Sequence, residues 1–215
     1  LAVVADELDA AGAAPERVST MVVEAGNAAR WAQATAFVQS QYGRLDWAVV
    51  NASAAQTTPV EESDLVDWGP KTAAHLEGAI ITLQALMILM SKNTQGGAIV
   101  LIAGASAIKP DSEGAPGLLQ VVRAAAQEAA RHNVRINAVA PGGPGTPMWT
   151  DLPWFQDTVR EAGNEQAAFD RISTSPLRAA RYAQGNDVAR LVSRLLADEA
   201  PINGATMVVD GGYTL

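Results

Sequence analysis

The side chains best suited to acid–base or nucleophilic chemistry lie near the middle of this 215-residue sequence. His75 stands within an apolar helical pattern, and Asp111, Ser112 and Glu113 follow one another in a polar stretch. A histidine with an acidic partner and a serine could act as base and nucleophile, if the fold brought them together. A single histidine on a helix is more often structural, so catalysis by His75 is the minor interpretation.

The same residues give no indication of a metal site. Asp111 and Glu113 are two positions apart, but no further ligand follows at a spacing that would complete a site for a hard cation. His132 stands near the expected end of a helix, where it would complement the helix dipole. We therefore predict no metal site.

The run INAVAPGGPGTPM, Ile136–Met148, indicates where functional residues would have to be placed. Its apolar first half suits a parallel strand that is covered on both faces, and Pro141-Gly142 ends that strand. Ligands of open α/β sheets bind beyond the carboxyl ends of the strands. This glycine- and proline-rich strand end therefore marks the edge where a site is expected.

Strand and helix patterns alternate along the rest of the chain. The predicted helices are Leu1–Ala11, Ala28–Gln41, Val66–Met90, Gly117–His132, Asp157–Ala162 and Asn186–Asp198. The predicted strands are Val18–Ala25, Asp46–Asn51, Ala98–Ala103, Val134–Ala140 and Thr206–Asp210. Apart from its short helix, Trp149–Arg181 is expected to be irregular. This alternation predicts an α/β fold with a doubly wound parallel sheet, in a single domain.

Composition excludes several classes of protein. The formal net charge of −8 argues against a nucleic-acid partner. The absence of cysteine excludes thiol catalysis, disulfides and cysteine-ligated zinc. The most apolar stretch, Gly78–Met90, is shorter than the roughly 20 residues that a membrane span requires. We therefore predict a cytoplasmic protein with neither a nucleic-acid nor a membrane partner.

Three stretches, taken in chain order, resemble the short-chain dehydrogenase/reductase family. They are LDWAVVNASA (Leu45–Ala54), INAVAPGGPGTPM (Ile136–Met148) and INGATMVVDGGYTL (Ile202–Leu215). The resemblance implies a Rossmann-like fold and hydride transfer with NAD or NADP. It also implies that the family's first two strands and glycine-rich turn precede Leu1 and are not in this chain. We expect more chain upstream, because the edge of the Asp46–Asn51 strand would otherwise be unpaired.

The resemblance assigns two candidate cofactor-binding residues, Asn51 and Thr146. Asn51 corresponds to the family's asparagine at the end of the fourth strand, and Thr146 to the threonine that reaches the nicotinamide amide. The alternatives are that Asn51 ties its strand to a loop and that Thr146 caps a helix. Gly26 stands where the family has an aspartate that holds the adenine, so that acceptor is lost.

The family's catalytic residues are replaced or missing. The family uses an asparagine, a serine, and a tyrosine whose pKa is lowered by a lysine. His75 occupies the asparagine position, and Gly104 the serine position, with Ser106 two residues further on. The tyrosine and lysine should precede Gly117, but Lys109–Pro116 runs directly into that helix without them. The resemblance therefore assigns no catalytic residue.

These losses predict a catalytically silent subunit that pairs with a homologous active subunit. The expected assembly is a hetero-tetrameric, NAD-dependent dehydrogenase of the hydroxyacyl-CoA type, with NAD in the partner subunit. The family's dimerisation helices correspond to Val66–Met90 and Gly117–His132, which stay apolar, and its other contact segment to Val208–Leu215. One alternative is an ordinary NAD(P)-dependent alcohol or ketone oxidoreductase whose cofactor loop and tyrosine–lysine segment are missing here. Another is a non-redox lyase or isomerase that uses His75.

Overall fold

The computed structural model describes residues 2–14, 17–51, 65–108, 116–142, 153–173, 183–197, 201–212 and 214. The helices are α1 (Ala2–Ala10), α2 (Ala28–Tyr42), α3 (Leu65–Met90), α4 (Pro116–Ala129), α6 (Pro153–Ala162), α7 (Glu165–Ser173) and α8 (Gly185–Leu196). Two 3-10 turns are η3 (Ala105–Ala107) and η4 (Ala130–His132). The strands are β1 (Trp47–Val50), β2 (Gly97–Ile102), β3 (Val134–Pro141) and β4 (Thr206–Val209).

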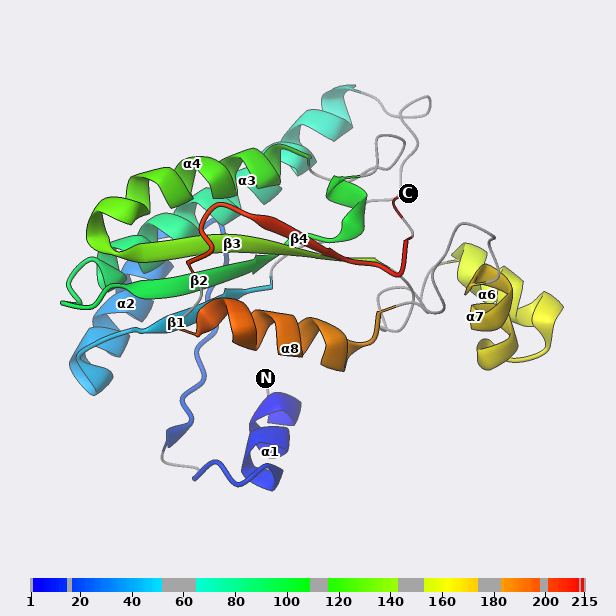
Figure 1. The fold of residues 1–215 in the computed structure, drawn as a ribbon, viewed down its shortest axis with the longest axis horizontal. Helices are drawn as coiled ribbons and strands as arrows, with labels where there is room; N and C mark the ends of the chain where they lie inside the picture. The colour runs from blue at the N-terminus through cyan, green and yellow to red at the C-terminus, as the bar shows by residue number, and fades with distance from the viewer. Residues whose placement is uncertain are drawn as a thin grey trace.

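The described strands form one parallel sheet in the order β1-β2-β3-β4. Helices α3 and α4 cover one face of this sheet and α8 covers the other, as Figure 1 shows. Trp31 of α2 packs against the same core as α3 and α4. The predicted α/β architecture with a doubly wound parallel sheet is therefore confirmed.

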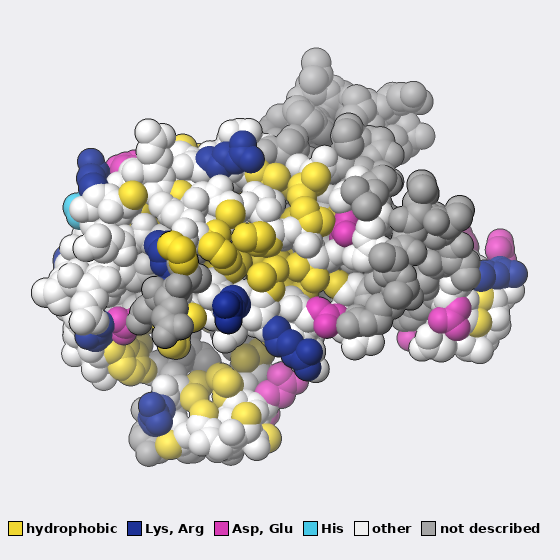
Figure 2. Space-filling view, in the orientation of Figure 1, with side chains coloured by type: hydrophobic (Ala, Val, Ile, Leu, Met, Phe, Trp, Pro, Cys, Tyr) yellow, Lys and Arg dark blue, Asp and Glu magenta, His cyan; other side chains and the backbone are white. Residues whose placement is uncertain are grey.

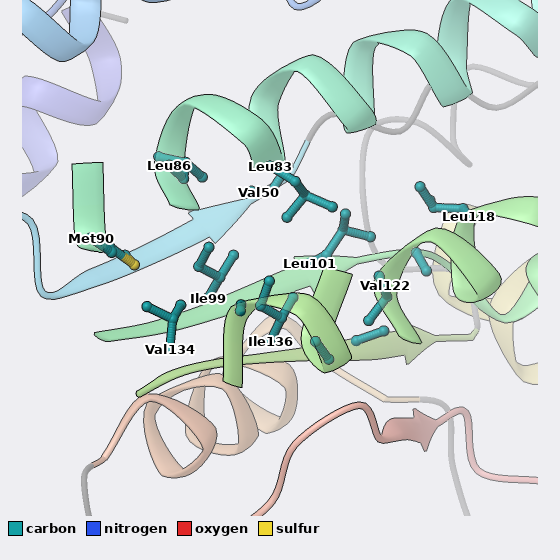
Figure 3. Close-up of a cluster of buried hydrophobic side chains, with 14 of the residues drawn as sticks. Val50, Leu83, Leu86, Met90, Ile99, Leu101, Leu118, Val122, Val134 and Ile136 are labelled. Carbon is teal, nitrogen blue, oxygen red and sulfur yellow. The ribbon is translucent and has the colours of Figure 1, made fainter. Parts of the chain in front are cut away.

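The larger hydrophobic core lies between the sheet and helices α3 and α4 (Figure 3). Ile99 of β2 and Ile136 of β3 are fully buried there. The next residue on β2, Val100, faces the opposite way and packs against Leu195 of α8. Because side chains alternate between the faces of a strand, near-continuous apolar runs such as these belong to strands that are covered on both faces.

Two asparagine side chains, the buried Asn137 and the exposed Asn203, tie the segment before β4 to β3. The Asn137 amide donates to the Ile202 carbonyl at 2.8 Å and accepts from the Ala205 N–H at 3.0 Å. Asn203 accepts from the Ile136 N–H at 2.8 Å and donates to the Ala126 carbonyl at 3.1 Å. These bonds fix the place of β4 at the sheet edge.

The predicted strand Val18–Ala25 is wrong. The structure has no strand there, and none of the described residues forms a backbone hydrogen bond with Val18–Val23. Val22 is 79% exposed. A β-branched run becomes a strand only when a neighbouring strand accepts and donates its backbone hydrogen bonds, and none of the described strands lies beside this run.

The expectation that Trp149–Arg181 is irregular is also corrected. Helix α6 contains the predicted Asp157–Ala162 helix but begins earlier, and α7 follows it. The side chain of Asn164 accepts from the Ala167 N–H at 2.8 Å, which is the bond of a helix N-cap. An asparagine followed by good helix formers was the signal for α7. Residues 149–152 and 174–181 lie outside the described residues.

Candidate functional site

The carboxyl ends of the four described strands meet at one edge of the sheet, because all the strands are parallel. Asn51 follows β1, Gly104 follows β2 by two residues, Gly142 follows β3, and Asp210 follows β4. In open α/β sheets this edge is where ligands bind. The candidate site is therefore built from strand ends that are far apart in the sequence.

Asn51 lies at this edge with an exposed side chain. Its amide makes no hydrogen bond with another residue of the described part of the chain. Thr146, the second predicted cofactor-binding residue, lies outside the described residues. The assignment of both residues to a cofactor stays a prediction.

Gly104 adopts a backbone conformation with φ of 78° and ψ of 148°. This combination belongs to a region that is open almost only to glycine, and other residues pay on the order of 1–3 kcal/mol to occupy it. Gly104 stands where the family resemblance places the catalytic serine. The turn after β2 is thus shaped for glycine at that position, and no hydroxyl is present there.

Gly142 closes the junction between three strand ends. A Cβ on Gly142 would lie 2.5 Å from the Cβ of Asp210 and 2.9 Å from the Cβ of Ala105. Only a glycine permits such a close approach. We assigned Gly142 and Asp210 no role in the site from the sequence, although Asp-Gly-Gly is a strong turn signal.

Gly26 precedes α2, whose N-cap is Asn27. A Cβ at position 26 would meet no atom within 4 Å, and the residue is exposed. An aspartate would therefore fit at this position. Packing therefore does not explain why glycine stands here in place of the aspartate that the family resemblance implies.

The residues considered for new catalysis lie largely outside the described part of the chain. His75 lies on α3, but its side chain is outside the described part, as are the Ser106 side chain and residues 109–115. His132 ends η4, as predicted, and accepts from the Arg131 guanidinium at 3.2 Å. Within the described residues no three His, Asp or Glu side chains gather as metal ligands.

Among the described residues, the pKa shift with a clear cause is that of Arg44, which lies away from this edge. Arg44 pairs with Asp46 just before the amino end of β1, and the hydrogen bond that the guanidinium donates to that carboxylate raises the pKa of Arg44. Both side chains are about half exposed, so the pair contributes little to stability. It has no part in the candidate site.

The described residues do not by themselves form a dinucleotide site. At the carboxyl edge they supply the polar side chains of Asn51 and Asp210, and the Asp210 carboxylate already accepts hydrogen bonds from Gly212 and Thr214. Among them, no glycine-rich turn leads from a strand of the sheet into a helix N-terminus, and Gly26 offers no acceptor for an adenine. None of the described helices has the length and apolar character that a membrane span requires.

The similarity to known proteins covers nearly the whole chain. The family described as enoyl-(acyl carrier protein) reductase matches residues 3–214. D-threitol dehydrogenase of Mycolicibacterium smegmatis is 31% identical over 185 residues, which are 83% of this chain and 66% of that relative. The chain thus spans about two thirds of the length of this relative and of others that match similarly.

Two further proteins align over almost the full chain. (2S)-[(R)-hydroxy(phenyl)methyl]succinyl-CoA dehydrogenase subunit BbsD of Thauera aromatica is 29% identical over 216 residues, which are 98% of this chain and 80% of that protein. The crystal structure of levodione reductase superimposes with a TM-score of 0.79 at 25% identity, covering 99% of this chain and 83% of the other.

Proposed function

The chain belongs to the short-chain dehydrogenase/reductase family, and from this we propose that it serves in an NAD(P)-dependent oxidoreductase that interconverts an alcohol and a carbonyl compound. The observation that carries the proposal is the family match over residues 3–214. Relatives with the names dehydrogenase and reductase support it. We further propose that the protein works in the cytoplasm.

In the simplest form of this proposal, the complete protein is an ordinary NAD(P)-dependent oxidoreductase. The nicotinamide cofactor would then be bound by Asn51, by Thr146 and by further residues of the full-length protein. The relatives favour this form, since their names describe enzymes that act on small polyols and ketones. The natural, full-length protein would then reduce NAD⁺ or NADP⁺ in the presence of a secondary alcohol.

A second form is favoured by the turn after β2. In it, the chain is a catalytically silent subunit, and a homologous active subunit supplies NAD, the serine, the tyrosine and the lysine. Gly104 sits in a conformation that a serine would adopt only with strain. No tyrosine occurs between Tyr42 and Tyr182, so the segment before α4 has none. The likeness to a protein that is itself a dehydrogenase subunit also supports this form.

The surfaces for such a partner would be α3, α4 and the edge at β4. Ile80 and Ile88 of α3 are exposed, as is Val208 of β4. Figure 2 shows hydrophobic side chains gathered in the middle of the face over β4. Apolar groups that stay exposed in one chain are typical of a surface that a subunit covers. We propose a hetero-tetramer with the active paralogue.

An activity assay separates these forms. The natural full-length protein is purified alone, and NADH formation from a panel of secondary alcohols is followed by absorbance. Turnover by the isolated chain supports the ordinary enzyme, and turnover only after the paralogue is added supports the silent subunit. Turnover of a substrate without nicotinamide, lost in His75→Ala, would contradict both and would establish the lyase alternative.

A further inference from the structure

The carboxylate of Asp210 is buried, at 7% exposure, where β4 ends. Its Oδ1 accepts from the Gly212 N–H at 2.8 Å. Its Oδ2 accepts from the N–H of Thr214 at 2.8 Å and from the Thr214 hydroxyl at 2.7 Å. A buried carboxylate is costly unless donors surround it, and these three donors reduce that cost. The carboxylate therefore holds the end of the chain in a turn beside the sheet.

Gly142 lies between Asp210 and the turn after β2, and it connects the ends of three strands. The Gly142 N–H donates to the Val209 carbonyl at 3.0 Å, which joins the end of β3 to the end of β4. A Cβ on Gly142 would overlap the Cβ of Asp210, at 2.5 Å, and that of Ala105, at 2.9 Å. Ala105 is 3% exposed and directly follows Gly104. A displacement of Asp210 would therefore be transmitted to the turn after β2 and to the chain that leaves β3.

We propose that Asp210 is a positioning residue of the candidate site. By holding Gly212 and Thr214 through its carboxylate, it fixes Gly142 and, through Gly142, Ala105, and so sets the direction in which the chain leaves β3 and β2. The inference rests on the proposed function, because it concerns the site at the same edge. Asp210 acts through its neighbours and makes no contact with the reacting atoms in this scheme.

Three variants and one control separate positioning from general stability. Asp210→Asn keeps the shape but turns an NH₂ group toward donors that need an acceptor. Thr214→Val removes only the hydroxyl donor, and Thr214→Ser keeps it. Glu128→Gln, on α4, removes a charge from an exposed ion pair with Arg131 and is the control.

The measurement is hydrogen–deuterium exchange by mass spectrometry on the natural protein or its complex. Asp210→Asn is expected to speed exchange in the C-terminal peptide by about tenfold, because charge-assisted hydrogen bonds are lost. Exchange in the peptides that contain Gly142 and Ala105 should also rise. Thr214→Val should give smaller rises in the same peptides, and Thr214→Ser and Glu128→Gln none. Thr214→Val carries the test if Asp210→Asn does not fold.

An increase confined to the C-terminal peptide would overturn the proposal, since Asp210 would then anchor only the chain end. NADH titration followed by fluorescence gives the second readout, with a dissociation constant about tenfold higher in Asp210→Asn, raised less in Thr214→Val and unchanged in Thr214→Ser. If NADH binds to neither wild type nor variants, binding by this chain fails as part of the proposed function. The exchange at Gly142 and Ala105 still decides the positioning role.

Discussion

Similar apolar residues are buried to different extents in two regions of the molecule. These regions are the N-terminal region, residues 2–51, and the C-terminal half, residues 97–142 and 183–209. Val100 and Val139 of the C-terminal half are fully buried, between neighbouring strands and α8. In the N-terminal region Val49 pairs in register with Val100, yet it is 50% exposed, and Trp47 is 56% exposed. Figure 1 shows α1 and the segment after it standing apart from the sheet.

The difference shows that apolar strand residues become fully buried only where a neighbouring strand and a covering helix are both present. Strands β2 and β3 have partners on both sides, whereas β1 and β4 each pair with one strand within the described sheet, and asparagine contacts hold β4 in place. An edge strand with exposed apolar residues favours further pairing. Most of the buried apolar side chains of the described structure therefore lie in the C-terminal half, which also carries most of the candidate site.

The largest expected effect comes from truncating a core residue of the C-terminal half. Ile136→Ala should lower the free energy of unfolding by about 3 kcal/mol, because the fully buried side chain leaves a cavity between β3 and α4. Val22→Ala in the N-terminal region should change it by less than about 0.5 kcal/mol. Urea unfolding measures the free energy of unfolding of both variants. Equal decreases in the two variants would contradict the difference between the two regions.

A smaller loss is expected at the polar contacts that hold β4. Asn137→Ala removes the partners of the Ile202 carbonyl and the Ala205 N–H, both in part-buried surroundings. Leaving them unsatisfied should cost about 2 kcal/mol in urea unfolding. Asn93→Ala, which removes bonds to the Leu45 and Gly96 carbonyls before β1 and β2, is the matched variant near the N-terminal region. A larger loss there than at Asn137 would contradict the account.

The smallest effects on stability are expected for two glycines that stand where the family resemblance places an aspartate or a serine. Gly104→Ala should destabilise by about 1 kcal/mol or more, because its φ of 78° and ψ of 148° suit glycine alone. Gly26→Ala should be neutral or stabilise by roughly 0.5 kcal/mol, since the site is open and an alanine narrows the unfolded ensemble. The midpoint of thermal unfolding shows the direction of both changes in stability. A Gly104→Ala variant as stable as the wild type would remove the structural support for the silent subunit.

Much of the C-terminal half could be predicted from the sequence. Continuous apolar runs such as Ala98–Ala103 carry their own signal, because strands buried on both faces need no alternation. The run Val18–Ala25 has the same local character, but its outcome depends on neighbours that local patterns do not encode. The N-cap of α7 at Asn164 was a local signal that our sequence analysis did not use.

The site was predicted less completely than the fold. The strand-end position of Asn51 followed from the end of an apolar run. The conformation of Gly104 and the contact between Gly142 and Asp210 depend on how three distant strand ends meet, which no single stretch encodes. Turn residues identify where the chain bends, and only the assembled sheet determines what they touch.

Native mass spectrometry of the complex isolated from the cells that make it, with NAD⁺ and NADP⁺ added, tests the central claim most directly. The account predicts an assembly that contains this chain and retains a nicotinamide nucleotide. A second, homologous chain in that assembly would identify the silent form, and a single longer chain the ordinary enzyme. An intact assembly that retains no nucleotide at saturating concentration would contradict the account.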